Sequence, residues 1–195
     1  NPGTIGNLTP GGKILASLFQ SVTLRTAGCA SFNQDALTEA SKVLSDLLMF
    51  VGGSSGSTAG GVKTVTMGLV ILSAVSTMRG RRQVTVFGRS ISQEDIANAV
   101  SIALLVMGLS LLGAAVITVC DGCSFMNAIY ETISALCTVG LTTGITPTLC
   151  TASKLILIVF MFFGRVGIMT IGVGFMMGDR AKERVQYAQT KVMIG

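Results

Sequence analysis

The chain has 195 residues, half of them apolar and only 12% charged, against about 25% charged in a typical soluble domain. It contains no histidine, which excludes a Ser-His-Asp triad, an HExxH zinc site and a haem-binding histidine. The net charge is +5, but the basic residues gather in two short stretches beside apolar runs. That distribution is typical of membrane topology rather than nucleic-acid binding, so we expect an all-α, multispanning membrane protein.

The first apolar tracts are short and separated by a polar break. Residues 43–51 are interrupted by Asp46, and residues 62–78 follow a segment rich in glycine and serine. Together they are long enough to cross a bilayer as one helix that is broken at its centre. Such a break cannot face lipid, because its backbone polar groups would lack partners, so we expect it to face a cavity.

Two longer apolar tracts follow. Ile96–Cys120 has 25 residues without a charge, and Leu155–Gly178 has 24 residues with one charge, Arg165, near its middle. Each is long enough to cross a hydrocarbon core about 30 Å thick.

The charges between these tracts predict their orientation. Basic residues gather in 79–95 and 179–195, whereas 121–154 carries a single one, so the positive-inside rule places the first two segments in the cytoplasm and the third outside. Residues 124–139 form a helix-length apolar stretch within that outer connection. Since both ends of the connection lie outside, this stretch must enter the membrane and return, which is the layout of a pore loop.

The sequence also repeats internally. From 24 to 52, ten of the 29 residues are identical to the residue 112 positions later, and with a slip of one residue 19–22 parallels 130–133. The matches include Thr-x-Gly, Ala-Ser-Lys and Met-Phe-x-Gly, so a chance likeness of two apolar hairpins is the weaker explanation. The repeated unit reads as span, pore helix, filter-like turn and span, complete at 96–178 and without its first span in the earlier copy.

Each copy contains a Thr-x-Gly turn, and Thr138-Val139-Gly140 matches the start of the potassium-filter sequence Thr-Val-Gly-Tyr-Gly. Main-chain carbonyls there can replace the water shell of a potassium ion, and glycine allows the backbone dihedrals this requires. The alternative is that Gly28 and Gly140 are simple helix C-caps. The predicted ion ligands are the carbonyls of Thr26, Ala27, Gly28, Cys29, Thr138, Val139, Gly140 and Leu141.

Three motifs, at 19–28, 52–64 and 134–144, resemble the Trk/Ktr/HKT superfamily of potassium transporters, most closely the membrane subunit of Ktr-type bacterial systems. The resemblance implies four span–pore–span units around a pseudo-fourfold pore. This chain would then supply the third unit at 1–95, without its first span, and the whole fourth unit with a cytoplasmic tail at 96–195.

The resemblance also implies an ion and partners. Both filter glycines are intact, which favours potassium; in plant relatives a serine in place of a filter glycine accompanies sodium preference, so sodium is the second candidate. Cys29 departs from the phenylalanine common in the family. The implied partners are the missing N-terminal half of the same polypeptide, a second copy in a homodimer, a cytosolic ring of nucleotide-binding regulatory subunits, and the lipid bilayer of the plasma membrane.

The glycine-rich break matches a family segment that obstructs the pore and moves to open it. Arg165 stands where the first copy has Gly53, and an arginine at that depth costs at least about 2.5–3.5 kcal/mol, so we expect it to bond loop carbonyls or hydroxyls. The alternative is a charge that ties two helices together; removing Arg165 or shortening 54–60 should raise potassium flux if the gating interpretation holds. The predicted gate residues are Gly52, Gly53, Ser54, Ser55, Gly56, Ser57, Thr58, Ala59, Gly60, Gly61, Lys63 and Arg165.

Other functions fit less well. A nucleotide-binding P-loop is disfavoured because Val62 separates Gly61 from Lys63, and an intramembrane enzyme lacks a catalytic constellation. Cys120 and Cys123 form a CxxC motif, for which packing is the favoured interpretation over redox or metal chemistry. The remaining alternative is a secondary transporter with discontinuous helices that couples a second ion to its substrate.

Overall fold

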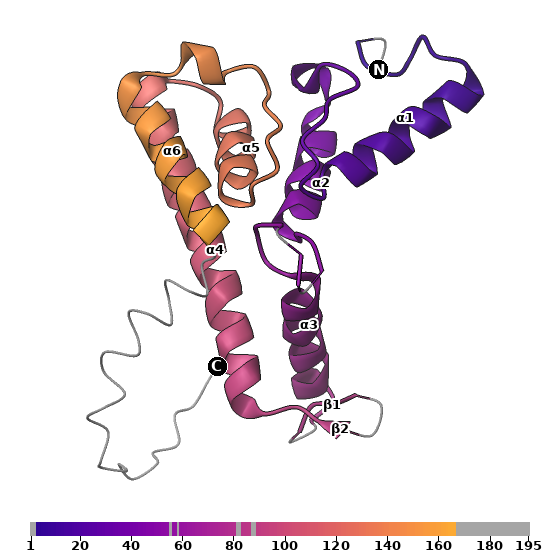
Figure 1. Cartoon of the computed structure of the whole chain (residues 1–195), viewed down its shortest axis with the longest axis vertical. Coiled ribbons are helices and arrows are strands. Elements are labelled where there is room, and N and C mark those ends of the chain that lie inside the picture. Colours follow the sequence, from indigo (N-terminus) through magenta and orange to yellow (C-terminus); the bar gives the residue numbers. More distant parts are fainter. Residues whose placement is uncertain (1–2, 55, 58, 81–82, 87–88, 167–195) are drawn as a thin grey trace.

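The computed structural model describes residues 3–54, 56–57, 59–80, 83–86 and 89–166 (Figure 1). This part of the chain is mostly helical, as predicted. Its helices are α1 (Pro10–Thr23), α2 (Glu39–Phe50), α3 (Thr64–Met78), α4 (Gln93–Asp121), α5 (Phe125–Leu136) and α6 (Thr151–Val166), with one-turn 3₁₀ segments η1 (Gln34–Ala36) and η2 (Thr146–Thr148).

A short antiparallel hairpin departs from the all-helical prediction. It pairs β1 (Thr85–Val86) with β2 (Arg89–Ser90), within the connection predicted to be cytoplasmic. The second half of the predicted 155–178 span and the whole of 179–195 lie outside the described residues.

The helices begin and end at residues suited to those positions. The hydroxyls of Thr9, Thr38 and Ser92 accept hydrogen bonds from backbone N–H groups in the first turns of α1, α2 and α4. α4 stops at Gly122, whose φ of 64° lies in the left-handed region that glycine adopts without strain.

Helix length and composition indicate which described helices could cross a membrane by themselves. Among the described residues, α4 is the one helix long and apolar enough to cross a membrane, and it contains the predicted span Ile96–Cys120; α3 is apolar but shorter. α5 has 12 residues, or about 18 Å, which is too short for a core about 30 Å thick. α5 lies within the apolar stretch 124–139 of the connection predicted to lie outside.

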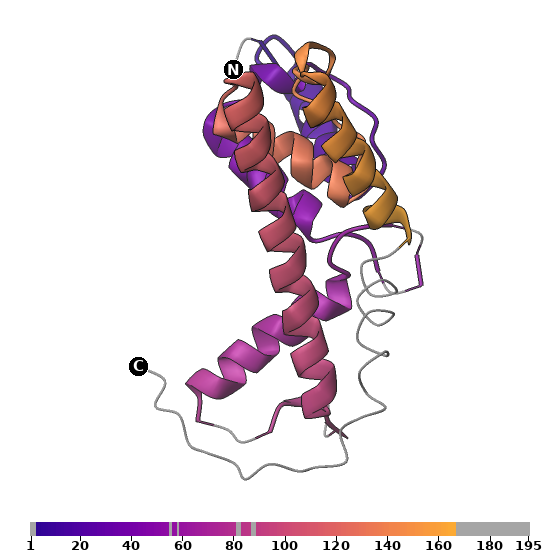
Figure 2. The same cartoon turned by 90° about the vertical axis from the view of Figure 1, so that its left-hand side faces the viewer.

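α5 lies at the centre of the packing. It contacts α4, α6 and α2, and the side chains of Tyr130, Leu136, Ile117 and Met49 around it are fully buried. α3 packs on α4 and crosses its lower part at an angle in Figure 2. α1 extends away from the other helices in Figure 1. The core therefore surrounds α5 and the turn that follows it.

A non-helical segment, 51–63, separates α2 from α3, in the region where the sequence predicts a broken span. Its ends are bonded to each other: Gly52 N–H donates to Val62 O at 2.9 Å, and Thr64 N–H donates to Gly53 O at 3.2 Å. Figure 1 shows α2 directly above α3 with this segment between them. Figure 2 shows that α2 and α3 lie at an angle to each other, and the hydrogen bonds between Gly52 and Val62 and between Thr64 and Gly53 close the loop between them.

Candidate functional site

The two Thr-x-Gly turns adopt the same unusual backbone. Thr26 and Gly28 have φ values of 64° and 74°, and Thr138 and Gly140 have values of 55° and 87°. The two threonines are the only non-glycine residues with positive φ in the described part of the chain. The left-handed conformation costs a residue with a side chain about 1–2 kcal/mol, so its presence at equivalent positions is a shared structural requirement.

The structure brings the two turns into contact. A Cβ atom added to Gly28 would lie 2.4 Å from Val139 O, and the ideal Cβ position of Gly140 lies 3.8 Å from Gly28 Cα. Gly28 therefore packs with its backbone directly on the carbonyl group of Val139. This contact joins residues far apart in sequence, from the first and second copies of the repeat.

Each turn is fixed by a hydroxyl from the helix before it. Thr23 Oγ1, at the end of α1, donates to Cys29 O at 2.6 Å, and Ser134 Oγ, near the end of α5, donates to Leu141 O at 2.6 Å. Both hydroxyls are buried, and their positions correspond in the repeat with its one-residue slip. The carbonyls of Cys29 and Leu141, which the sequence analysis counted among the ion ligands, are thus bonded to protein.

Sequence reasoning missed these two hydroxyls and the strained threonines. The signal that could have revealed the two hydroxyls is the internal repeat, in which Thr23 of one copy corresponds to Ser134 of the other. α1 ends at Thr23 and α5 at Leu136, so the partial negative charge of each C-terminus lies beside its turn.

The glycine-rich loop packs against the second turn. Gly60 N–H donates to Thr138 Oγ1 at 2.9 Å, and a Cβ atom on Gly60 would lie 2.8 Å from Cys137 O. Gly61 follows with a φ of 72°, and its added Cβ would lie 3.0 Å from Cys137 Sγ. Among the predicted gate residues, Ser55 and Thr58 lie outside the described residues.

Lys63 holds the loop from its C-terminal end. Its Nζ donates to Ser57 O at 2.9 Å and to Ala59 O at 2.5 Å. The sequence predicts bonds of this kind for Arg165. The short span of sequence between Lys63 and the loop explains why a lysine side chain can reach both carbonyls.

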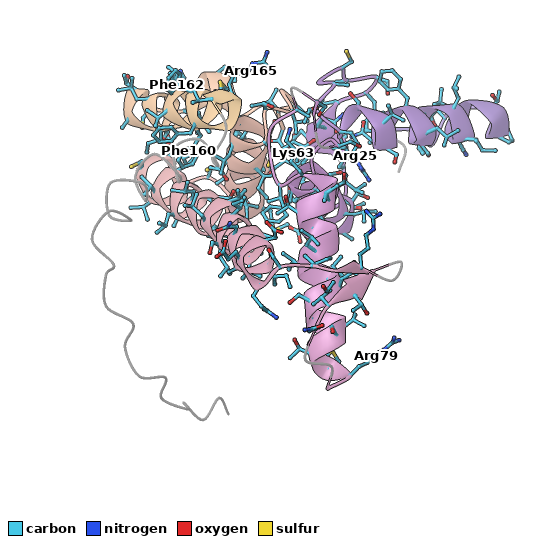
Figure 3. The ribbon with its side chains drawn as sticks, turned by 60° about the horizontal axis from the view of Figure 1, so that its bottom comes forward. Arg25, Lys63, Arg79, Phe160, Phe162 and Arg165 are labelled. Carbon is cyan, nitrogen blue, oxygen red and sulfur yellow. The ribbon has the colours of Figure 1, made fainter. Side chains whose placement is uncertain are left out.

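Arg165 lies in the last turn of α6, beside a different part of the site. Its side chain is exposed and lines an open cavity of about 530 Å³ together with Thr138, Gly140 and Glu131. Figure 3 shows Arg165 at the end of α6 and Lys63 at the start of α3. The two basic residues thus lie on separate elements near one Thr-x-Gly turn.

The cysteines show no sign of a metal or redox centre within the described residues. Cys120 and Cys123 are both free thiols, and no group of three or more potential metal ligands is found there. Burial raises the pKa of the Cys123 thiol, which lowers the fraction of reactive thiolate.

Comparison with known proteins supports a transport role for relatives of this chain. The family model described as "TrkH: Cation transport protein" matches residues 1–183. Ktr system potassium uptake protein B of Bacillus subtilis (strain 168) is 38% identical over 195 residues, which cover 100% of this chain and 43% of that protein.

Two further relatives are similar over nearly the same extent. Potassium/sodium uptake protein NtpJ of Enterococcus hirae is 35% identical over 188 residues, covering 94% of this chain and 42% of that protein. Ktr system potassium uptake protein B of Vibrio alginolyticus is 34% identical over 197 residues, covering 100% of this chain and 42% of that protein. The chain spans less than half the length of these curated relatives.

The family resemblance expected from the three motifs is therefore confirmed, and the relatives are named as uptake proteins rather than enzymes. The apolar α4 and the family match together identify a membrane protein. On the match over residues 1–183, the chain belongs to the TrkH family of cation transport proteins.

Proposed function

We propose that this chain forms part of the pore of a potassium uptake transporter, in which ions pass the main-chain carbonyls of the two Thr-x-Gly turns. The observation that carries the proposal is the contact between Gly28 and Val139, which sets two turns of equal backbone conformation side by side. Sodium is the second candidate ion, since one relative is named as a potassium/sodium uptake protein.

The proposal uses the chemistry of exposed backbone carbonyls. Carbonyl oxygens can replace the hydration shell of a potassium ion when several face one point. Because Cys29 O and Leu141 O already accept hydroxyl hydrogen bonds, the carbonyls of 26–28 and 138–140 are the stronger candidates. The C-terminal ends of α1 and α5 favour a cation beside these turns.

The glycine-rich loop is proposed as the gate. Its bond from Gly60 to Thr138 places it against the second turn, where it would obstruct an ion leaving that turn. Lys63 stabilises this position through two loop carbonyls, and Arg165 adds positive charge to the cavity beside Thr138. Movement of the loop away from Thr138 would open the path.

A complete pore requires further protein. The relatives are more than twice as long as this chain, and α1 presents exposed apolar side chains that suit burial against another part of the same polypeptide. These side chains are Ile14, Leu15, Leu18, Phe19 and Val22. We further propose a homodimer, with cytosolic nucleotide-binding regulatory subunits at 79–95 and 179–195 and the connection 121–154 on the outside.

Ion flux measured with the full-length protein that contains this chain tests the function. Reconstituted in vesicles, it should take up potassium down the gradient at a rate that does not require sodium. A fixed sodium-to-potassium stoichiometry would instead support a coupled secondary transporter, which the broken α2–α3 helix also permits. Absence of selective potassium uptake in the reconstituted protein would refute the proposal.

Thiol labelling tests the orientation separately. Cys29 is exposed and follows the first turn, whereas Cys137 is fully buried. In variants that retain one cysteine, a membrane-impermeant maleimide added outside intact cells should label Cys29 and leave Cys137 unmodified. Labelling of Cys29 only after the cytoplasmic side is opened would reverse the proposed topology.

A further inference from the structure

A buried carboxylate on α5 holds the segment that follows the second turn. Glu131 is only 5% exposed, and both of its carboxylate oxygens accept hydrogen bonds. Oε1 accepts from Thr142 Oγ1 at 2.6 Å and from Thr143 N and Oγ1 at 2.9 and 3.2 Å, and Oε2 accepts from Thr146 Oγ1 at 3.0 Å. All these donors follow Gly140, so the carboxylate ties the segment after the second turn, residues 142–146, to α5, the helix that precedes the turn.

The first turn has an equivalent attachment made of amides. Gln20, on α1, is the counterpart of Glu131 in the repeat with its one-residue slip. Its Nε2 donates to Gln34 Oε1 at 2.7 Å, and Gln34 Nε2 donates back to Gln20 Oε1 at 3.3 Å. Gln34 is the first residue of η1, as Thr146 is of η2, so the two attachments join corresponding positions.

Tyr130 connects α5 with the paired amides of the first copy. Its hydroxyl donates to Gln34 Oε1 at 3.3 Å, across 96 residues of sequence. Tyr130 is fully buried, Gln34 is 2% exposed, and Tyr130 immediately precedes Glu131 on α5. Tyr130 therefore ties α5, the helix that carries Glu131, to the paired amides of the first copy, and these buried polar groups are costly to leave unsatisfied.

We propose that Glu131 and Gln20 are positioning residues: each holds the segment after its turn and thereby fixes the turn carbonyls that select the transported ion. The inference rests on the proposed function of the turns. Its physical basis is short covalent distance, since Thr142 lies only two residues beyond Gly140. Displacement of the segment after the turn would rotate the peptide groups of the turn and change the spacing of their carbonyl oxygens.

The structure also indicates which part of Glu131 matters. A glutamine there can accept from Thr142 and Thr143 through its carbonyl oxygen and donate from its amide to Thr146 Oγ1. Thr146 could then donate its own hydroxyl hydrogen to Thr142 Oγ1, which lies 2.9 Å away. The first copy already uses glutamine at this position. Hydrogen-bond geometry, rather than negative charge, is therefore the requirement that we assign to residue 131.

The test compares Glu131→Gln with Glu131→Ala in the full-length protein, with Glu39→Ala as the control because Glu39 is an exposed acid in the first turn of α2. The readouts are the potassium-over-sodium preference in vesicle uptake, measured by competition, and the amount of folded protein by gel filtration. E131A should lose about tenfold or more in preference, because it removes four hydrogen bonds and the loss of one such bond to a charged group already corresponds to about tenfold. E131Q and E39A should stay near the wild-type value.

Two results would overturn the inference. One is wild-type preference in folded E131A; the other is an equal loss in E131Q and E131A, which would make charge the requirement. If E131A does not fold, Thr146→Val decides, since it removes one donor at little change in volume: a reduced preference supports the inference and an unchanged one refutes it. Failure of the wild-type protein to select potassium would refute the proposed function instead.

Discussion

The backbone N–H of Gly60 donates a hydrogen bond of 2.9 Å to the side-chain oxygen of Thr138, across 78 residues of sequence. Thr138 is itself held at a positive φ. One side chain therefore connects the glycine-rich loop with the strained turn of the second repeat, so displacement of either segment should be felt by the other.

Gly60→Ala should raise potassium uptake by the full-length protein. The new methyl group would lie 2.5 Å from Thr138 Oγ1 and 2.8 Å from Cys137 O, and the latter is backbone that cannot move aside cheaply. The loop should therefore leave the turn, and uptake rates at equal protein amount measure the effect. Gly68→Ala is the control, since nothing lies within 4 Å of the Cβ it adds on α3. Unchanged uptake by folded G60A would argue against a gating loop.

Lys63→Met should also raise uptake, by roughly three- to tenfold. The substitution keeps most of the aliphatic length but removes the bonds to Ser57 O and Ala59 O, and hydrogen bonds from a charged donor are each worth about 1.5–3 kcal/mol, less where water competes. Lys13→Met on the exposed surface of α1 is the matched control. The measurement is the initial rate of potassium uptake in vesicles. A decrease in K63M would indicate that the lysine supports conduction instead.

Gly28→Ala should impair selective uptake more than Gly140→Ala. Both residues have positive φ, so an alanine at either is strained by about 1–2 kcal/mol, but only at position 28 would its Cβ clash with a backbone atom, Val139 O at 2.4 Å. Competition between potassium and sodium uptake measures the difference. Gly108→Ala, with open space around its added Cβ on α4, should be close to wild type. The reverse order of severity would contradict the contact between the turns.

Asp121→Ala should lower the melting temperature of the purified protein. The Asp121 carboxylate joins the end of α4 to the start of α6 by accepting from Cys150 N at 2.6 Å and from the Ser153 hydroxyl. Asp121→Asn keeps one acceptor oxygen and should fall between the variant and the wild type. Differential scanning fluorimetry in detergent gives the order, with the exposed Glu94→Ala as the control. A melting temperature equal to that of wild type in D121A would show that this connection is not needed for stability.

The sequence could predict elements that depend on local composition. The uncharged run in α4, the short apolar α5 and the glycine-rich break between α2 and α3 each follow from residues that are neighbours in the chain. The repeat also located both Thr-x-Gly turns, because identical residues recur at one spacing. The small hairpin of β1 and β2 was missed because its paired segments are only two residues long and carry no clear alternation.

The parts that could not be predicted depend on direction and tertiary contact. The direction of the Arg165 side chain could not be predicted, nor could the bonds from Lys63 to Ser57 O and Ala59 O. The repeat with its one-residue slip already pairs Gln20 with Glu131, but the hydrogen bonds that each makes to the segment after its turn depend on tertiary contact and could not be predicted. The packing of Gly28 on Val139 leaves no trace in either local sequence.

That packing has a mechanical consequence. There is no room for even a methyl group between Gly28 and Val139 O. Neither Thr-x-Gly turn can therefore move toward the other alone, and a displacement of one turn is passed to its neighbour. A disturbance at either turn should then be shared by both rather than absorbed where it arises.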